Sequence, residues 1–346
     1  MQLSESRRPV FRGEDAVYHI VSRVSCGKRI FGGETKEEFV AILRRQAVFS
    51  GVVILAYCFM SDHFHLLVRV SPHKWLSDGE LIERNRALSS GGKCSSRGID
   101  PGLLERILLD DQRDGTTDTR SSNNADRYDA REWREKLQSR MGDVSCFMRE
   151  TKQRFGIWYN QQHGNSGTIW ADRYKSLIVE PSREAMAMIA AYIDLNCVRA
   201  GLVSDPADYR FCSYGAAVNG SLLARDGYCS VYGVESWDVA SSMHRDLLFG
   251  RHCGNPGKVR MGRTSPERLR RALDDDEKLT LQEALRCRVR YFTDGMALGS
   301  QPYLARLLAE HPKWFSEKRK PVFAKMKGAD WGGLRVVRNL VIAPIL

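Results

Sequence analysis

The chain has 346 residues, a formal net charge of +11 and a sequence pI near 9.3. That length allows one large domain with a smaller one or with insertions. The basic balance favours an anionic partner such as nucleic acid, although it also suits a merely soluble surface. Nine cysteines without a C-x-x-C pair indicate reduced, cytoplasmic thiols rather than a disulfide framework or zinc ribbon. Without a signal peptide or a run of 18 apolar residues, we expect neither secretion nor a membrane segment.

The first elements read as a strand, a helix and a hairpin. "AVYHIVSRV" (16–24) alternates and is rich in β-branched residues, which predicts a strand. Thr35 and Glu38 form a T-x-x-E capping box before the helical run "FVAILRRQAVF". The strand-like runs "GVVILAYCFMS" and "DHFHLLVRV" meet at Ser61 and Asp62, so a tight hairpin is expected there.

Residues 77–140 differ in composition from the preceding segment and are rich in Gly, Ser, Asp and Arg. We expect a partly disordered insertion with short helices around 102–110 and 130–141. Its mixed charge favours a solvated linker over a binding arm.

Order resumes with a predicted amphipathic helix (144–160), a strand (174–180) and a helix from Arg183 to Gly201 behind the N-cap Ser182. The order β-α-β-β-α-β-α resembles a ferredoxin-like α+β antiparallel sheet with packed helices. Beyond 255 two helical runs, one with a Thr280–Glu283 capping box, suggest either a helix-turn-helix-like reader or a plain accessory region. The expected organisation is therefore a catalytic domain (1–76 and 141–215), an insertion (77–140), a linker (216–254) and a basic, mainly helical C-terminal region (255–346).

Two pairs of residues have spacings that suit chemistry. His63 and His65 share one face of their strand, and two neutral imidazoles side by side suit a divalent cation, although a structural role is the common alternative. Tyr192 and Asn196 are spaced i and i+4 on one helix face. A tyrosine hydroxyl next to a metal-bound phosphate could act as a nucleophile, or the ring could simply fill space.

The H-x-H strand after "YCFMSD", the segment "GTIWADRYKS" and "YIDLNCVRAGLV" together resemble the single-tyrosine HUH transposases of the IS200 type, and in particular the REP-associated tyrosine transposases. The resemblance covers about residues 8–75 and 143–215; "GMALGS" and "DWGGLRVVRNL" also resemble tails in that branch. It implies that His63 and His65 are paired metal ligands, Tyr192 the nucleophile and Asn196 the third ligand, with Mg²⁺ or Mn²⁺ as cofactor.

Two departures from the family pattern and one alternative tyrosine need comment. The family hairpin usually reads Pro-Asn before the first histidine, whereas this chain has Ser61-Asp62, and Cys197 stands where the family has proline after the ligand asparagine. These departures put activity rather than fold in doubt. Tyr174 in "DRYKS" is a weaker candidate nucleophile because position i+4 holds Ile178.

The resemblance further implies an enzyme that cleaves and rejoins hairpin-associated single-stranded DNA, with REP-like sequences as partner, through a 5′-phosphotyrosine intermediate. Such a protein would act in the cytoplasm with the nucleoid, as a monomer or homodimer. A non-catalytic, domesticated DNA-binding protein and a metal-dependent phosphoesterase are the alternatives. Basic residues expected to contact the nucleic acid are Arg12, Arg23, Arg173, Lys175, Arg199, Lys318, Arg319 and Lys320. Three aromatic residues could stack on bases or complete a core: Trp158, Tyr159 and Trp170.

Overall fold

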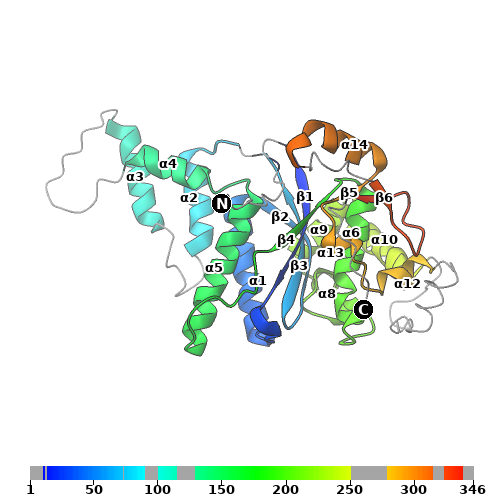
Figure 1. The fold of residues 1–346 in the computed structure, drawn as a ribbon. Coiled ribbons are helices and arrows are strands. Elements are labelled where there is room, and N and C mark those ends of the chain that lie inside the picture. Colours follow the sequence, from blue (N-terminus) through cyan, green and yellow to red (C-terminus); the bar gives the residue numbers. More distant parts are fainter. Residues whose placement is uncertain are drawn as a thin grey trace, which may run out of the picture.

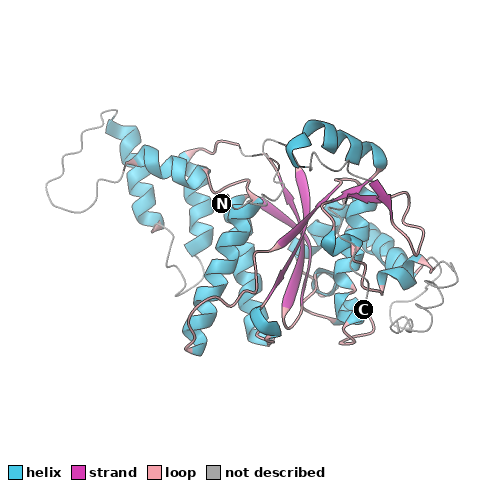
Figure 2. Cartoon of the chain, in the orientation of Figure 1, coloured by secondary structure: helices cyan, strands magenta, loops and turns pink. Residues whose placement is uncertain are grey.

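The computed structural model describes residue 11 and residues 14–72, 74–89, 100–114, 129–250, 279–314 and 323–337. A seven-stranded sheet runs through the middle of the molecule, with helices on both faces (Figures 1 and 2). Its strands are β1 (Ala16–Arg23), β2 (Val52–Phe59), β3 (His63–Val70), β4 (Lys175–Val179), β5 (Ala297–Gly299), β6 (Phe323–Lys325) and β7 (Arg335–Val337). They are arranged in the order β2-β3-β1-β4-β5-β7-β6.

The first four strands form the predicted ferredoxin-like unit. Neighbouring strands in the order β2-β3-β1-β4 are all antiparallel. The β2–β3 hairpin closes over Ser61 and Asp62, since the Met60 amide donates to the His63 carbonyl at 2.8 Å. The α+β fold class expected from the order of the elements is confirmed.

One face of the sheet packs against α1 (Gly33–Ser50) and α5 (Val144–His163) (Figure 1). Strand alternation sends Phe64, Leu66 and Val68 of β3 into this core. Trp170 belongs to the same core, where its indole Nε1 donates to the Lys152 carbonyl at 3.0 Å. Its packing is that of a core residue.

The start of α1 corrects one prediction. The helix begins at Gly33, so Thr35 already lies in its first turn and its hydroxyl donates to the carbonyls of Ile30 (2.9 Å) and Gly32 (3.2 Å). Glu38 pairs instead with Arg45 at 3.0 Å. The Thr35–Glu38 capping box was therefore wrong, because the helix starts before it.

The opposite face is covered by α6 (Arg183–Asp194), α7 (Asn196–Arg199), α8 (Ser213–Val218), α9 (Leu222–Tyr232) and α10 (Trp237–Phe249). Ser182 caps α6 by accepting from the Ala185 amide, as predicted. The single helix expected from Arg183 to Gly201 is divided at Leu195, and Gly201 ends it with a left-handed φ of 71°. The described ranges also contain short 3₁₀ helices at Ser25–Gly27, Pro206–Asp208 and Pro312–Trp314.

Residues 216–254, expected to be a linker, contain most of the helices α8 to α10, which pack on β2 and α6. Gly227 explains how α9 approaches so closely. A Cβ at this position would lie 2.6 Å from the Leu55 carbonyl oxygen of β2. The glycine thus lets a helix lie directly on the strand backbone, a reason that periodicity alone does not reveal.

The described part of the insertion is helical and packed. It contains α2 (Asp78–Ser89), α3 (Pro101–Asp114) and α4 (Ala130–Gln138), of which α3 and α4 match the two short helices predicted. A small core joins this part to α1: Phe49, Leu81, Ile82, Leu88, Leu104, Leu108, Ala130, Leu137 and Met141. The Arg134 guanidinium holds the Asp78 carboxylate with two bonds of 2.7 and 2.8 Å. Residues 90–99 and 115–128 lie outside the described residues.

The C-terminal region adds strands as well as helices. Its helices are α12 (Leu281–Leu285), which has the predicted Thr280–Glu283 capping box, α13 (Tyr291–Asp294) and α14 (Gln301–Glu310). The segment "GMALGS" contains β5, which pairs in parallel with β4 through Ile178 and Ala297. The two helical runs around this segment, which suggested a helix-turn-helix, are α12 and α14, and within the described ranges α13 and β5 lie between them. The run "SPERLRRAL" (265–273) lies outside the described residues. No helix in these ranges is long and apolar enough to cross a membrane.

Gly227→Ala should lower the free energy of unfolding by about 3 kcal/mol, because a rigid backbone oxygen occupies the space that the methyl group needs. Gly156→Ala in the middle of α5 is the control. Its Cβ would meet nothing closer than 3.8 Å, so helix propensity should leave stability unchanged or raise it by up to about 1 kcal/mol. Urea denaturation measures both, and equal effects would contradict the close packing of α9 on β2.

Candidate metal and nucleophile site

The strand register places the two histidines in a row of side chains across the sheet. His65 lies opposite Cys58 of β2 and Val21 of β1, and Val21 in turn lies opposite Lys175 of β4. His63 lies opposite Arg23. Residues directly opposite each other project from the same face, so His63, His65 and Lys175 all lie on the face that α6 covers.

The hydrogen bonds of His65 determine which ring nitrogen carries its proton. His19 of β1 has its Nδ1 atom 2.8 Å from the Phe292 carbonyl oxygen and its Nε2 atom 3.0 Å from His65 Nδ1. A carbonyl only accepts, so His19 Nδ1 donates to it, and the Nε2 atom of the neutral ring must accept. His65 Nδ1 therefore donates to His19, which leaves the lone pair of His65 on Nε2.

His63 reaches the same state through a different partner. Its Nδ1 atom lies 2.7 Å from an Asp62 carboxylate oxygen. A carboxylate accepts, so Nδ1–H donates this hydrogen bond and the lone pair of the neutral ring lies on Nε2. Asp62, one of the two departures from the family pattern, thus orients the first imidazole. At the other departure, the Cys197 thiol donates to the Asp194 carbonyl at 3.1 Å, a bond that proline could not make.

Burial keeps the imidazoles neutral. It lowers the pKa of His65 well below its usual range, and the nearby His19 ring acts in the same direction. Burial also lowers the pKa of His63, against the opposing effect of Asp62. The pKa of His19 falls to about 4 for the same reason. A neutral imidazole is the form that binds a metal ion.

α6 brings Tyr192 to these histidines. The centroid of its ring lies 6.1 Å from that of His65 and 6.2 Å from that of His19, both edge to face. Phe292 packs on the ring at 5.0 Å, and the Arg199 guanidinium carbon lies 4.0 Å from its centroid. Among the described residues the Tyr192 hydroxyl has no hydrogen-bond partner, and the residue is buried.

Asn196 lies one helical turn after Tyr192, as its spacing predicted. Its side-chain amide donates to the Ile193 carbonyl at 2.9 Å and to the Tyr192 carbonyl at 3.4 Å. These bonds use the nitrogen and leave the carboxamide oxygen as the atom that could bind a cation. Its role as third ligand remains a prediction.

The predicted basic residues have different surroundings. Arg23 and Arg173 are exposed, and Lys175 is exposed beside Asp294 at 3.3 Å. Arg199 is held inside, because its two terminal nitrogens donate to the Tyr192 and Leu285 carbonyls at 2.7 Å each. It therefore supports the helix that carries Tyr192. The remaining four lie outside the described residues: Arg12, Lys318, Arg319 and Lys320.

Sequence reasoning missed two buried groups near the site. One is His19, whose place on the site face could have been suspected from strand alternation in "AVYHIVSRV" but whose partners could not. The other is Asp194, fully buried between Tyr192 and Asn196 in sequence. It accepts bonds from the Tyr228 hydroxyl (2.5 Å), His244 Nε2 (3.0 Å) and the Ser213 hydroxyl (3.2 Å). The Asp194 carboxylate thereby ties α6 to the helices behind it.

A separate group of potential ligands lies where the N-terminal segment meets α14. Glu14, Glu310 and His311 bring one ligand atom each within 4.8 Å of one another. Both carboxylates are exposed, and His311 Nε2 is 3.5 Å from Glu14. Exposed acidic groups of this kind are common, so we assign no site to them.

Asp194→Ala should destabilise the protein by about 3–5 kcal/mol, because it leaves several buried donors without an acceptor. Asp208→Ala is the control. This aspartate is exposed in the nearby 3₁₀ helix, and its loss should change stability by less than about 0.5 kcal/mol. Similar shifts of the two urea midpoints would show that the Asp194 network does not anchor α6.

The comparison with protein families agrees with the motifs over part of the chain. Residues 13–84 match the family described as "Transposase IS200 like". The search of curated proteins found no match. Among solved structures, the chain is similar to one titled "Structure of the REP associates tyrosine transposase bound to a REP hairpin", at 14% identity and a TM-score of 0.37, over 64% of this chain and 88% of that chain. The family match contains β1, α1, the hairpin and both histidines, so the resemblance to IS200-like transposases is confirmed for residues 13–84.

Proposed function

We propose that this protein cleaves and rejoins single-stranded, hairpin-associated DNA through a covalent bond between Tyr192 and a 5′ phosphate. The observation that carries the proposal is the approach of the Tyr192 ring to His65, at 6.1 Å between ring centroids, beside two imidazoles with available Nε2 lone pairs. The family match supports the reaction class, and the motif resemblance supports hairpin-associated single strands as the substrate.

The donor atoms suit a divalent cation. His63 and His65 are neutral and offer one nitrogen each, and Asn196 offers a carboxamide oxygen. These three residues would hold Mg²⁺ or Mn²⁺. When bound, such a cation supplies Lewis-acid stabilisation of the charge on the scissile phosphate.

Tyr192 would supply the nucleophile. Its oxygen attacks phosphorus while its proton passes to solvent, the bond from phosphorus to the 3′ oxygen breaks, and that oxygen takes up a proton. The Arg199 guanidinium lies over the Tyr192 ring at 4.0 Å, and Phe292 packs against the same ring in a T-shaped arrangement at 5.0 Å. These contacts limit rotation of the ring before the attack. The positive charge of Arg199 also favours the negative charge that develops on the phenol oxygen.

The reverse step uses the same residues. The phosphotyrosine keeps the energy of the phosphodiester, so a 3′ hydroxyl can attack phosphorus and release Tyr192 without another energy source. Arg23 and Lys175 project from the site face and could bind the backbone phosphates of the strand. A phosphate would compete with Asp294 for Lys175.

One observation favours the alternative of a non-catalytic DNA-binding protein. The Tyr192 side chain is only 2% exposed, so a strand has limited access to its hydroxyl. Among the departures from the family pattern, Ser61 and Cys197 point the same way, whereas Asp62 orients His63. Covalent chemistry distinguishes this alternative from the transposase-like reaction.

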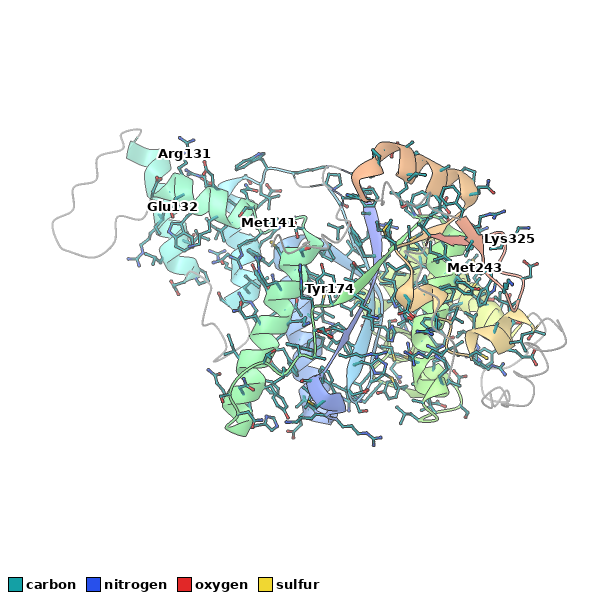
Figure 3. The ribbon with its side chains drawn as sticks, viewed as in Figure 1. Arg131, Glu132, Met141, Tyr174, Met243 and Lys325 are labelled. Carbon is teal, nitrogen blue, oxygen red and sulfur yellow. The ribbon has the colours of Figure 1, made fainter. Side chains whose placement is uncertain are left out.

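Tyr192→Phe should abolish a covalent protein–DNA adduct, detected on denaturing gels after incubation with Mn²⁺ and labelled hairpin oligonucleotides that carry single-stranded flanks. Chelation of the metal should abolish it as well. Tyr174→Phe is the matched control, because the Tyr174 hydroxyl bonds to Ser145 of α5, on the other face of the sheet (Figure 3). This variant should form the adduct at the wild-type rate.

An adduct that persists in Tyr192→Phe would refute the assignment of the nucleophile. Metal-dependent cleavage without any adduct would identify a phosphoesterase. Salt-sensitive binding without cleavage, indifferent to Tyr192 and to metal, would identify a DNA-binding protein.

A further inference from the structure

We propose that His19 is a positioning residue for the metal site, and that it links the Phe292 carbonyl of the C-terminal region to the ligand His65. The inference rests on the proposed function, since it assigns a role toward the cation that His63, His65 and Asn196 would hold. It goes beyond that function because His19 contacts neither the cation nor the DNA.

The geometry of His19 leaves little freedom. It is 1% exposed, its ring lies 5.2 Å from that of His65 with 17° between the planes, and both of its nitrogens are engaged. Phe292 fixes which nitrogen of His19 donates, and His19 then fixes which nitrogen of His65 donates. The lone pair with which His65 would bind a metal ion is thus determined two hydrogen bonds away, by a backbone carbonyl of α13.

The same α13 residue also supports the nucleophile. The Phe292 ring packs on Tyr192 at 5.0 Å, while its carbonyl accepts from His19 at 2.8 Å. Phe292 therefore contacts both the nucleophile and the support of the metal ligand. It lies far outside residues 13–84, which makes the C-terminal region part of the site rather than an appendage.

The competing explanation is a buried histidine that merely satisfies its own hydrogen bonds. The two explanations differ in what a leucine would do. Leucine could fill the space, but it would leave His65 Nδ1 without an acceptor and its tautomer undetermined. Partners of this kind typically contribute about 10–100-fold to metal affinity. A histidine of purely structural importance would change stability without changing that affinity.

The test is a Mn²⁺ titration of the full chain, with free Mn²⁺ followed by EPR. His19→Leu should bind about 10–100-fold more weakly than the wild type. In His19→Gln the amide oxygen can accept a hydrogen bond from His65, so this variant should lose less Mn²⁺ affinity than His19→Leu. It should also remain folded if His19→Leu does not. His65→Gln is the reference for loss of a ligand, and His311→Gln controls for binding at Glu14 and Glu310. Circular dichroism establishes that each variant is folded.

Phe292→Leu distinguishes the contact of the Phe292 carbonyl with His19 from the contact of its ring with Tyr192. It keeps the backbone carbonyl and removes the ring, so Mn²⁺ affinity should stay at the wild-type value while adduct formation falls. This split would not arise from general loosening of the C-terminal region.

Wild-type affinity in folded His19→Leu would overturn the inference. So would a loss as complete as that of His65→Gln, because His19 would then be a ligand itself. If His65→Gln also bound Mn²⁺ normally, the metal site of the proposed function would fail as well. Failure confined to the His19 variants would leave the proposed function intact.

Discussion

Neutral imidazoles beneath a helix are the constraint on which the rest of the site depends. Burying a polar ring without a partner costs free energy, and burying it charged costs more. The chain satisfies this requirement with one acceptor for each ring, Asp62 for His63 and His19 for His65. Each acceptor receives a hydrogen bond from Nδ1–H, so both rings carry their lone pair on Nε2. The hydrogen bonds that satisfy the buried rings therefore also determine which lone pairs the proposed metal site would use.

Two nearby residues of α6 contact different parts of the protein. Tyr192 faces the histidines, while Asp194, two residues later, points away into a network of Tyr228, His244 and Ser213. The helix is buried from Ala185 to Asp194. A helix that is apolar on all sides has no solvent face from which to select its rotation, so a single buried carboxylate with several donors can set that rotation. The position of Tyr192 over the sheet follows from it.

Local patterns predicted what local geometry determines. Alternation along β3 placed both histidines on one face, a two-residue joint predicted the hairpin, and the i, i+4 spacing brought Asn196 next to Tyr192. The role of His19 depends on the register between β1 and β3 and on a carbonyl 273 residues away, neither of which sequence periodicity encodes. β5 and β7, with three residues each, are too short for an alternating pattern. The need for glycine at position 227 could not be predicted either, because it arises from a contact with Leu55 of β2, which is distant in sequence.

The parallel pairing of β5 with β4 has a consequence for assembly. In a bare four-stranded unit β4 would be an open edge, and two copies could join there into one continuous sheet. Here that edge is occupied by the chain's own β5 and β7. At the opposite border, Phe211 and Ser213 bond to the end of β2, at Phe59 and Tyr57. Sheet extension between copies at β4 is therefore blocked from within the chain.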